Sequence, residues 1–395
     1  MSAAILSARA VFWISFGLIV YTYFVYPVIL FVCYALAQLR TDLRYLLSRM
    51  DRRVSSLVDG DLPGVTFVIP AYNEEKHLQQ KITNLQEIDY PGERLQIIFV
   101  SDGSTDSTNE ILASVSNGSF EVVKLAQRGG KANALNEAVT RARHNILVFS
   151  DASTLFAPDA VRKLVRHFAD RSVGVVCGAL RFQASSESRQ TEGVYWKYES
   201  ILRLMEGRLG TTLTASGAVY ALRREAYIPL APGTVLDDFV TPVNARKQGY
   251  RVLYDPEAVA LDFAPSSVKG EFARRVRLAV GSFRSLGDFL RAPLPGFTRF
   301  AFISHKLMRW IVPILLVALL FANIFLLRQH FYQALLVLQV IFYAWAAAGF
   351  LFQEQMRRVR FGGIGYFILA MNLAFLVGLY RCLIGRKEAT WQRVS

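Results

Sequence analysis

The chain has 395 residues, 53% of them hydrophobic and 13% aromatic, and a formal net charge of +14. It is long enough for a complete α/β domain, and its apolar surplus indicates membrane segments. The positive charge would suit a nucleic-acid-binding protein, but the basic residues cluster beside apolar segments instead of covering a recognition surface. Nucleic acid is therefore excluded as a partner.

Taken in chain order, the first predicted element is an apolar segment at residues 11–37, which is longer than the roughly 20 residues that a bilayer requires. A cleaved signal peptide is the alternative interpretation. The length of the segment and the single Arg9 ahead of it favour a retained membrane anchor. Three more spans are expected at residues 310–327, 332–352 and 363–380.

Basic residues are concentrated next to these spans. They are Arg40, Arg44, Arg49, Arg52 and Arg53 after the first span, and Lys269, Arg274, Arg275, Arg277, Arg284, Arg291, Arg299, Lys306 and Arg309 before the second. Because positive residues stay on the cytoplasmic side, this pattern places the central domain in the cytoplasm. We expect an integral protein of a bacterial inner (plasma) membrane, with membrane lipids as partners.

Two further basic groups bear on the topology of the spans. Arg357, Arg358 and Arg360 lie between the third and fourth spans and agree with a topology that has the central domain in the cytoplasm. The basic tail, residues 386–393, does not, because four spans place both termini outside.

The soluble domain is expected to open at Pro63, after a charged connector at 40–60 that is partly helical along the membrane surface. Strands are predicted at 65–72, 95–100, 121–125, 146–150, 173–182 and 214–222, and helices at 75–86, 107–115, 132–143, 158–168, 191–206 and 239–248. Two short strands close the domain near Phe263. The repeated alternation of strand and helix predicts a parallel sheet. Arginines alternate with apolar residues at 268–291, which predicts a helix in the membrane interface.

Polar residues end three of the predicted strands. The strand at 146–150 is apolar and runs directly into Asp151, a carboxylate that no core accepts unpaired. Tyr72 and Glu74 end the first strand, and Asp102 ends the second. Because ligands of parallel sheets bind beyond the carboxyl ends of the strands, these side chains are expected to converge on one crevice.

Each of these signals has a purely structural alternative. The segment DGSTD at 102–106 is also a turn and helix cap, and Asp237 and Asp238 are also a capping pair for the next helix. The segment QRGGK at 127–131 differs from a phosphate loop because Ala132 follows it, yet as a helix N-terminus it suits a diphosphate. The cysteines, at 33, 177 and 382, lack metal-site spacing and are expected to be buried thiols.

Six motifs occur together in one order. They are PAYNEE (70–75), SDGSTDST (101–108), GGKANALN (129–136), FSDAST (149–154), LDDFVTPVNARKQGYR (236–251) and RRVRL (274–278). This order resembles that of family 2 glycosyltransferases. The layout of one span, a catalytic domain, an interfacial helix and several spans resembles the membrane-embedded synthases of cellulose, hyaluronan, poly-N-acetylglucosamine and nodulation chitooligosaccharides. The resemblance covers about residues 65–278 by motif, and it implies an α/β GT-A (nucleotide-diphospho-sugar transferase) domain plus transmembrane α-helices.

The resemblance also implies a donor site. It assigns Tyr72, Glu74 and Asp102 to the nucleotide, whose base is usually uracil, and places Lys131 near the diphosphate. Asp151 would hold a divalent metal, Mg²⁺ or Mn²⁺, that bridges the phosphates.

The remaining roles implied by the resemblance concern the reaction itself. Asp238 matches the aspartate that deprotonates the acceptor hydroxyl, and Arg275 and Arg277 match the arginines that close over the departing diphosphate. Asp237, its neighbour, is a candidate for acceptor binding. Trp196 and Tyr198 are the nearest aromatic residues that could stack on an acceptor sugar, and packing in the core, which their helical spacing favours, is the alternative. One metal, two guanidinium groups and one carboxylate suit the displacement of a nucleoside diphosphate, with inversion at the sugar.

The chain departs from the family pattern at two motifs. Ser153 stands where the DxD motif usually has its second acid, which removes one charged metal ligand. The Q-x-x-R-W pattern of processive synthases appears with Arg274, Arg277 and Leu278, so its Gln and its Trp are absent.

The expected division is an N-terminal span at 1–38, a connector at 39–62, a cytoplasmic catalytic domain at 63–265, interfacial helices at 266–306, three spans at 307–384 and a tail at 385–395. We expect an inverting hexosyltransferase that moves sugar from a nucleotide-sugar donor, UDP-linked by the resemblance, onto a growing polysaccharide, with or without coupled export. One alternative is a single addition to a lipid-linked acceptor, a glycolipid, which Leu278 favours. The other is a nucleotide-binding or scaffolding subunit of a glycan secretion complex, which Ser153 favours.

Overall fold

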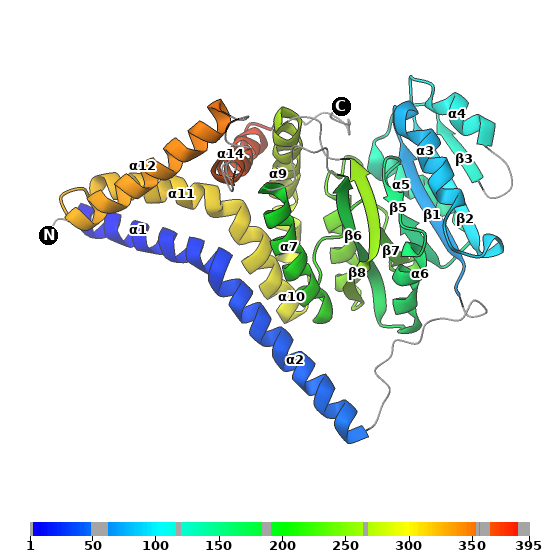
Figure 1. Cartoon of the computed structure of the whole chain (residues 1–395), viewed down its shortest axis with the longest axis horizontal. Helices are drawn as coiled ribbons and strands as arrows, with labels where there is room; N and C mark the ends of the chain where they lie inside the picture. Colours follow the sequence, from blue (N-terminus) through cyan, green and yellow to red (C-terminus); the bar gives the residue numbers. More distant parts are fainter. Residues whose placement is uncertain are drawn as a thin grey trace.

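The computed structural model describes residues 3–48, 62–115, 120–183, 191–263, 268–352, 355 and 364–385. One end of the elongated molecule is an α/β domain, and the other end consists of long apolar helices (Figure 1). Three helices lie between the two ends: α7 (Thr191–Arg208), α9 (Val268–Arg291) and α10 (Gly296–Ala301). Residues 49–61, 356–363 and 386–395, including several arginines that bear on topology, lie outside the described residues.

Within the described residues, four helices are long and apolar enough to cross a membrane, in agreement with the sequence-based expectation. The first comprises α1 (Ala3–Val20), a π-helical turn η1 (Tyr21–Val25) and α2 (Tyr26–Ser48). The second continues from α10 through a π-helical turn η6 (Phe302–Leu307) into α11 (Met308–Phe325). The others are α12 (His330–Leu351) and α14 (Ile364–Leu383). The second span thus begins earlier than expected, because the helix is continuous from Gly296.

The α/β domain is built on one sheet of eight strands in the order β3-β2-β1-β4-β7-β6-β8-β5. Their bounds are β1 Val65–Ala71, β2 Leu95–Asp102, β3 Phe120–Leu125, β4 Ile146–Phe149, β5 Leu155–Phe156, β6 Val173–Gln183, β7 Tyr220–Arg223 and β8 Arg251–Phe263. The first four strands in this order are mutually parallel, so their carboxyl ends share one edge. The chain reverses its direction of progress between β1 and β4, which is where open α/β sheets place their ligands.

The expectation of a parallel sheet is wrong for the second half of the domain. β7 runs antiparallel to both β4 and β6, and β5 runs antiparallel to β8. The reason is that α7 and the segment after it return the chain to the sheet from the opposite direction. The two strands expected near Phe263 are one strand, β8, which pairs with β6 in parallel. The pairing shifts register between Gly178 and Ala179 and then continues to the ends of both strands.

The predicted strand at 214–222 is mostly wrong as well. Only its last three residues belong to β7, and Ala215 instead donates its backbone N–H to the carbonyl of Asp238 at 2.8 Å. This segment is therefore diverted from the sheet to the crevice at the carboxyl edge. The helices expected at 75–86 and 268–291 coincide with α3 (Glu75–Gln86) and α9.

The sheet is covered on both faces, which explains why all seven residues of β1 are buried. On one face, Phe67 and Ile69 pack in a core with α3, α4 (Thr108–Val115) and α6 (Ala160–Val165). On the other face, Val68 packs with α5 (Lys131–Arg141). The alternation along β1 thus fixes which helix lies on which face.

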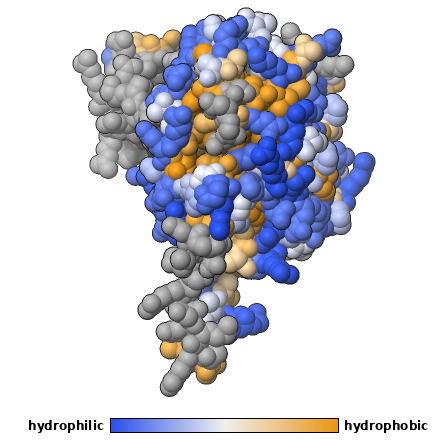
Figure 2. Space-filling model, turned by 90° about the vertical axis from the view of Figure 1, so that its right-hand side faces the viewer, coloured by the Kyte–Doolittle hydropathy of each residue, from blue (hydrophilic) through white to orange (hydrophobic). Residues whose placement is uncertain are grey.

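The two ends of the molecule differ in surface character. Seen from the end that carries β1 to β3, the surface is mainly hydrophilic, with apolar bands between the polar residues (Figure 2). The membrane-type helices instead expose large apolar side chains, among them Phe31, Leu36, Val340 and Leu351. This contrast is what a bilayer around one end of the molecule requires.

Gly103, after β2, has a positive φ of 66°, and a Cβ there would lie 2.9 Å from the backbone nitrogen of Arg128. We expect Gly103→Ala to lower the free energy of unfolding by about 1–2 kcal/mol, because a residue with a Cβ is strained in the left-handed region. Gly92→Ala is the matched control, since nothing lies within 4 Å of a Cβ at that position. Thermal and denaturant unfolding in detergent compare the two, and equal stability of both variants would contradict the expectation.

Candidate active site

The carboxyl edge of the sheet is organised by Asp102, at the end of β2. Its side chain is fully buried and accepts hydrogen bonds from the backbone N–H groups of Gly129 and Gly130, at 2.7 and 2.8 Å. These N–H groups precede α5, so Asp102 fixes the start of the helix that carries Lys131. From the sequence, these backbone N–H groups were candidates for binding a diphosphate. In the structure both are already hydrogen-bonded to the Asp102 carboxylate.

The loop after β1 is tied to the loop after β2. Asn73 has a positive φ of 54°, and its side-chain oxygen accepts a hydrogen bond from the N–H of Thr105 at 2.9 Å. Glu74 is buried, and its backbone N–H donates to the hydroxyl of Thr108 at 2.9 Å. The two motifs that sequence reasoning assigned to the nucleotide therefore form one rigid wall of the crevice.

Tyr72 is covered by a residue that sequence reasoning missed. The guanidinium of Arg128 lies 3.7 Å from the centre of the Tyr72 ring, a cation–π contact. A flat cation stacked on an aromatic ring marks a place suited to a planar base. Its signal in the sequence is only the position of Arg128 directly before the GGK motif.

Lys131 joins three parts of the chain in the crevice. Its ammonium lies 2.9 Å from Asp151, beyond β4, and 3.1 Å from Asp237, at the start of α8 (Asp237–Lys247). Burial lowers the pKa of Lys131, but the carboxylates of Asp151 and Asp237 outweigh this and leave it raised. Lys131 therefore stays charged and neutralises part of the negative charge that Asp151 and Asp237 place at this edge of the sheet.

Asp238 lies next to this group, half-buried at the start of α8. A Cβ placed on Gly217 would lie 3.3 Å from the Cβ of Asp238 and 3.5 Å from the ammonium of Lys131, so Gly217 leaves the space in front of both open. Desolvation and the charge of Asp237 raise the pKa of Asp238 to about 6. A carboxylate with this pKa is a better proton acceptor near neutral pH than an ordinary aspartate.

The acid missing at position 153 has a spatial counterpart that sequence reasoning did not find. The hydroxyl of Ser153 donates to the carboxylate of Asp262, at the end of β8, at 3.0 Å. Within the described residues, no three His, Cys, Asp or Glu side chains gather as a metal cage. The residues fit a different arrangement, in which Mg²⁺ or Mn²⁺ shares one or two carboxylates with substrate phosphates. Asp151 would hold such an ion, with Asp262 close behind Ser153.

A buried lysine lies beneath this part of the edge. Lys81 of α3 is fully buried, and its ammonium donates to the Ser150 hydroxyl at 2.7 Å and to the Thr154 carbonyl. Burial lowers its pKa to about 7, although Asp151 and Asp262 act to raise it. The sequence signal for this burial was the position of Lys81 on the same face of the helix as the apolar residues Leu78 and Leu85.

The other predicted residues lie farther along the chain. Arg275, on α9, forms an ion pair with Glu271 at 2.7 Å, and Arg274 pairs with the same carboxylate. Arg277 is half-buried on the same helix. Leu278, where the family has Trp, packs in an apolar cluster with Phe239 of α8 and Trp310 of α11.

The predicted acceptor residue Trp196 belongs to α7, but its side chain lies outside the described residues. The neighbouring aromatic, Tyr198, donates its hydroxyl to the carbonyl of Tyr23 in the first span, at 3.2 Å. Tyr198 therefore contacts a membrane helix.

Comparison with known proteins adds to this geometry. Residues 66–229 match the family described as Glycosyl transferase family 2. Over 233 residues the chain is 27% identical to poly-beta-1,6-N-acetyl-D-glucosamine synthase of Staphylococcus aureus (strain COL), covering 57% of this chain and 56% of the relative. The synthase of Staphylococcus epidermidis is 26% identical over 230 residues, which cover 56% of this chain and 55% of the relative. The chain thus spans about half the length of the curated relatives that it matches.

The fold is also that of a solved structure. A mannosyltransferase from Pyrobaculum calidifontis, in complex with GDP-Man and Mn²⁺, superposes with a TM-score of 0.72 at 22% identity. The match covers 97% of this chain and 99% of the mannosyltransferase. The predicted GT-A-like domain with several apolar helices is therefore confirmed.

Replacing Lys131 tests whether its ammonium group holds Asp151 and Asp237 together at the edge of the sheet. We expect Lys131→Met to lower the free energy of unfolding by about 3–5 kcal/mol, because Asp151 and Asp237 would be left without their cation. Mn²⁺ should restore part of this loss, and stabilise the variant more than the wild type. The control is Lys163→Met, which removes an exposed pair with Asp159 at 2.6 Å and should cost only about 0.3–0.5 kcal/mol. Similar losses in both variants, measured by unfolding in detergent, would refute the central place of Lys131.

Proposed function

Because the chain belongs to glycosyl transferase family 2 through residues 66–229, we propose that it transfers a sugar from a nucleoside diphosphate donor to an acceptor hydroxyl, with inversion at the sugar. The observation that carries this proposal is the pair Asp237 and Asp238 beside Lys131 and Asp151 at the sheet edge. It combines a proton acceptor with a cation and a metal-type carboxylate in one crevice, which are the groups that such a displacement needs.

The donor lies at the carboxyl ends of β1 and β2 in this proposal. Tyr72, Glu74 and Asp102 form the wall that receives the nucleoside, and Arg128 adds a flat cation to it. Uracil is the base that we propose. Guanine stays in the test panel, since the mannosyltransferase of the same fold binds GDP-Man.

The diphosphate lies over Lys131 and Asp151. Asp151 would hold the Mg²⁺ or Mn²⁺ ion, whose chemistry is to neutralise charge on the phosphates. The structure of the mannosyltransferase with Mn²⁺ supports this choice of ion. Lys131 keeps its charge beside the same phosphates, because the two carboxylates raise its pKa.

The acceptor hydroxyl faces Asp238. Its carboxylate takes the proton as the oxygen attacks the sugar from the side opposite the leaving diphosphate. Asp237 is held by Lys131 and orients the start of α8, and Trp196 remains a candidate for stacking on the acceptor. Arg275 and Arg277 would close over the diphosphate as it leaves, for which Arg275 must exchange its pair with Glu271.

Elongation of a glycan polymer is the acceptor reaction that we propose first. The likeness to poly-beta-1,6-N-acetyl-D-glucosamine synthases, over about half of their length, supports it. The four long apolar helices of the described residues support membrane association, and the basic residues beside them support a catalytic domain on the cytoplasmic side of a bacterial inner membrane.

A single addition to a lipid-linked acceptor is the second candidate, and a cavity favours it. A space of about 440 Å³ lies between α1, α11, α12 and α14. Apolar side chains such as Phe16, Leu316 and Leu373 line it, together with Gln339, Tyr343 and Asn372. Sugar hydroxyls would lose hydrogen bonds to water in such a lining, whereas a hydrocarbon chain would not.

Replacing the proposed base tests the function. Asn keeps the shape of Asp238 but cannot take a proton, so Asp238→Asn should lower the transfer rate by roughly 10²- to 10⁴-fold while donor binding persists. Asp237→Asn is the matched control and should have a milder effect. The assay measures free nucleoside diphosphate, and the length of the labelled product separates polymer elongation from single addition. Transfer by Asp238→Asn at the wild-type rate would mean that the base lies elsewhere.

Metal dependence is tested by binding as well as by activity. In the presence of the nucleoside diphosphate, Asp151→Asn should weaken Mn²⁺ binding by roughly tenfold or more, since the loss of about 1.4 kcal/mol is a factor of ten. The electron paramagnetic resonance signal of unbound Mn²⁺ reports this directly. Asp159→Asn, at an exposed acid, should bind Mn²⁺ like the wild type. Full activity in excess EDTA would contradict the metal role.

A further inference from the structure

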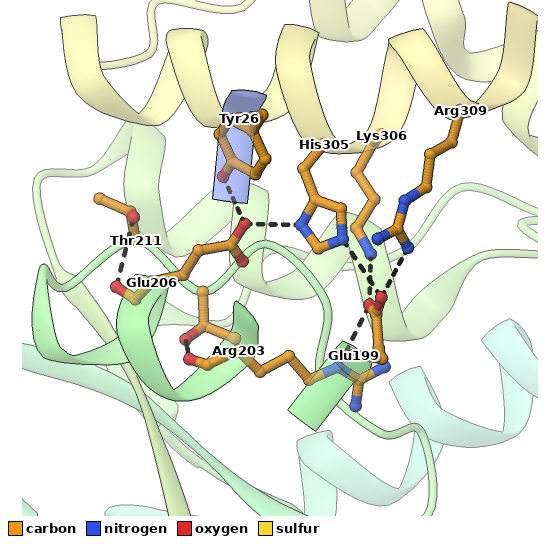
Figure 3. A network of polar contacts seen from close by, with 9 residues as sticks. Tyr26, Glu199, Arg203, Glu206, Thr211, His305, Lys306 and Arg309 are labelled. Atoms are coloured by element: carbon orange, nitrogen blue, oxygen red, sulfur yellow. Dashed lines mark hydrogen bonds and ion pairs between the residues drawn. The ribbon is translucent and has the colours of Figure 1, made fainter. Parts of the chain in front are cut away.

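A buried polar network joins the catalytic domain to two membrane spans (Figure 3). Glu206 of α7 accepts a hydrogen bond from the hydroxyl of Tyr26, in the first span, at 2.8 Å. His305 belongs to η6 in the second span, and its Nδ1 lies 2.6 Å from the same Glu206 oxygen. Its Nε2 lies 3.2 Å from an oxygen of Glu199, also on α7. All four side chains are buried, so bulk water does not replace these contacts.

The network contains two carboxylates, and the first of them, Glu199, is surrounded by cations. It faces Lys306 at 3.1 Å, Arg309 at 2.7 Å and Arg203 at 3.6 Å. Burial acts to raise the pKa of this carboxyl, but Lys306, His305 and Arg309 hold it well below its usual range. Glu199 is therefore ionised and only accepts hydrogen bonds.

The second carboxylate, Glu206, shares a hydrogen with His305. A neutral imidazole has one N–H donor and one acceptor nitrogen. Since Glu199 only accepts, Nε2 of His305 carries the hydrogen of that contact. A second hydrogen must then lie between Nδ1 and Glu206, whichever of the two carries it. The distance of 2.6 Å agrees with a charge-assisted hydrogen bond, which is about twice as strong as a neutral one.

The turn that carries His305 also contacts the first turn of α8. Phe302 of η6 packs on Phe239 of α8, with ring centres 5.9 Å apart. Phe239 directly follows Asp238, the proposed base. Trp310 of α11 adds a second contact to the Phe239 ring, at 6.2 Å. η6 is thus held to α7 by a hydrogen bond and to α8 by aromatic packing, and π-helical turns such as η6 are frequent at functional sites.

A second route runs from Glu206 to Asp238 through the segment after α7. The backbone carbonyl of Glu206 accepts a hydrogen bond from the N–H of Thr211 at 2.9 Å. Leu213 is fully buried in the apolar cluster that packs on the first turn of α8. Ala215 then donates its N–H to the carbonyl of Asp238 at 2.8 Å. The end of α7 is therefore tied to the backbone of the proposed base.

We propose that His305 is a positioning residue for the proposed base. Through Glu206 it fixes η6 and the end of α7 against each other, and both hold the first turn of α8, with Asp238, in the crevice. This inference rests on the proposed function, in which Asp238 takes the acceptor proton. It makes two membrane spans part of the frame of the active site, because Tyr26 and His305 belong to them.

The proposal predicts a loss of turnover without a loss of donor binding. His305→Leu bonds to neither carboxylate, so kcat should fall roughly 10- to 100-fold, because a misplacement of about 1 Å at a reacting group has an effect of that order. The affinity for UDP or GDP with Mn²⁺ should stay at the wild-type value. The wall that receives the nucleoside is built by the loops after β1 and β2, which η6 does not hold.

Two variants of Glu206 separate positioning from general packing. Glu206→Gln keeps the contact, because its amide N–H can donate to Nδ1 of His305 while its amide oxygen accepts from Tyr26. Its kcat should remain close to that of the wild type. Glu206→Leu breaks the same contact as His305→Leu and should lower kcat to a similar extent. Since both remove one shared contact, the double variant should be no slower than either single variant.

Ser304→Ala is the matched control. Ser304 is the neighbour of His305 and is equally buried, and its hydroxyl lies 2.6 Å from that of Tyr21 in the first span. The substitution therefore removes a contact between the two spans and leaves the contact of His305 with α7 in place. Its kcat should equal that of the wild type.

The experiment uses the full-length protein in detergent. Release of nucleoside diphosphate at saturating donor gives the turnover. Titration with UDP and with GDP in the presence of Mn²⁺ gives the affinity and the number of folded sites, by which the turnover is divided. Should His305→Leu fail to fold, the double variant His305→Leu/Glu206→Leu takes its place with the same loss expected, because apolar replacement of a buried charged pair is often neutral for stability.

A lower kcat per folded site in His305→Leu and Glu206→Leu, with wild-type values in Glu206→Gln and Ser304→Ala, supports the proposal. Wild-type kcat per folded site in His305→Leu, equal losses in both Glu206 variants, or a parallel loss of nucleotide affinity overturns it. Failure of the proposed function is a different result. That function fails if the wild type releases no nucleoside diphosphate or if Asp238→Asn keeps full activity, whereas the inference fails in an active enzyme.

Discussion

The site depends on one ammonium group placed between two carboxylates. Lys131 is positioned by the start of α5, which Asp102 in turn fixes through two backbone hydrogen bonds. From there it reaches Asp151 and Asp237, which come from the end of β4 and the start of α8. Without that cation, the carboxylates of Asp151 and Asp237 would lie partly buried and unpaired, which would cost several kcal/mol of folding stability. The ends of a parallel sheet and a distant helix are thus held in one crevice by charge.

A second charge system lies behind the first. The carboxylate of Glu199 gathers cations from α7 and from the second span, and this group borders the aromatic cluster of Phe239, Phe302 and Trp310. Asp238 lies beside the first system, since a Cβ on Gly217 would face both its Cβ, at 3.3 Å, and the ammonium of Lys131, at 3.5 Å. Its pKa of about 6 reflects desolvation and the charge of Asp237, which the charge of Lys131 opposes. The second span therefore packs against the start of α8, next to Asp238, through Phe302 and Trp310.

Sequence patterns predicted the first half of the catalytic domain well, because its strands and helices are local and strongly periodic. They also predicted that Tyr72, Asp102 and Asp151 end strands at one edge, which parallel pairing of β1, β2 and β4 ensures. The direction of β7 and the single long β8 were missed, since both depend on pairing with strands far away in the chain. The same reason hid Asp262 behind Ser153 and Lys306 beside Glu199. No spacing in the sequence reports a contact between residues that only the tertiary fold brings together.

The central claim is that this crevice displaces a nucleoside diphosphate from a sugar in one step, with Asp238 as the base. The most direct measurement incubates the purified protein with a panel of UDP- and GDP-sugars, and follows the anomeric configuration of the product by NMR together with release of the diphosphate. The account predicts that one donor releases diphosphate and yields a product of opposite configuration to the donor. A product of retained configuration, or a folded protein that releases diphosphate from no donor in the panel, would contradict it.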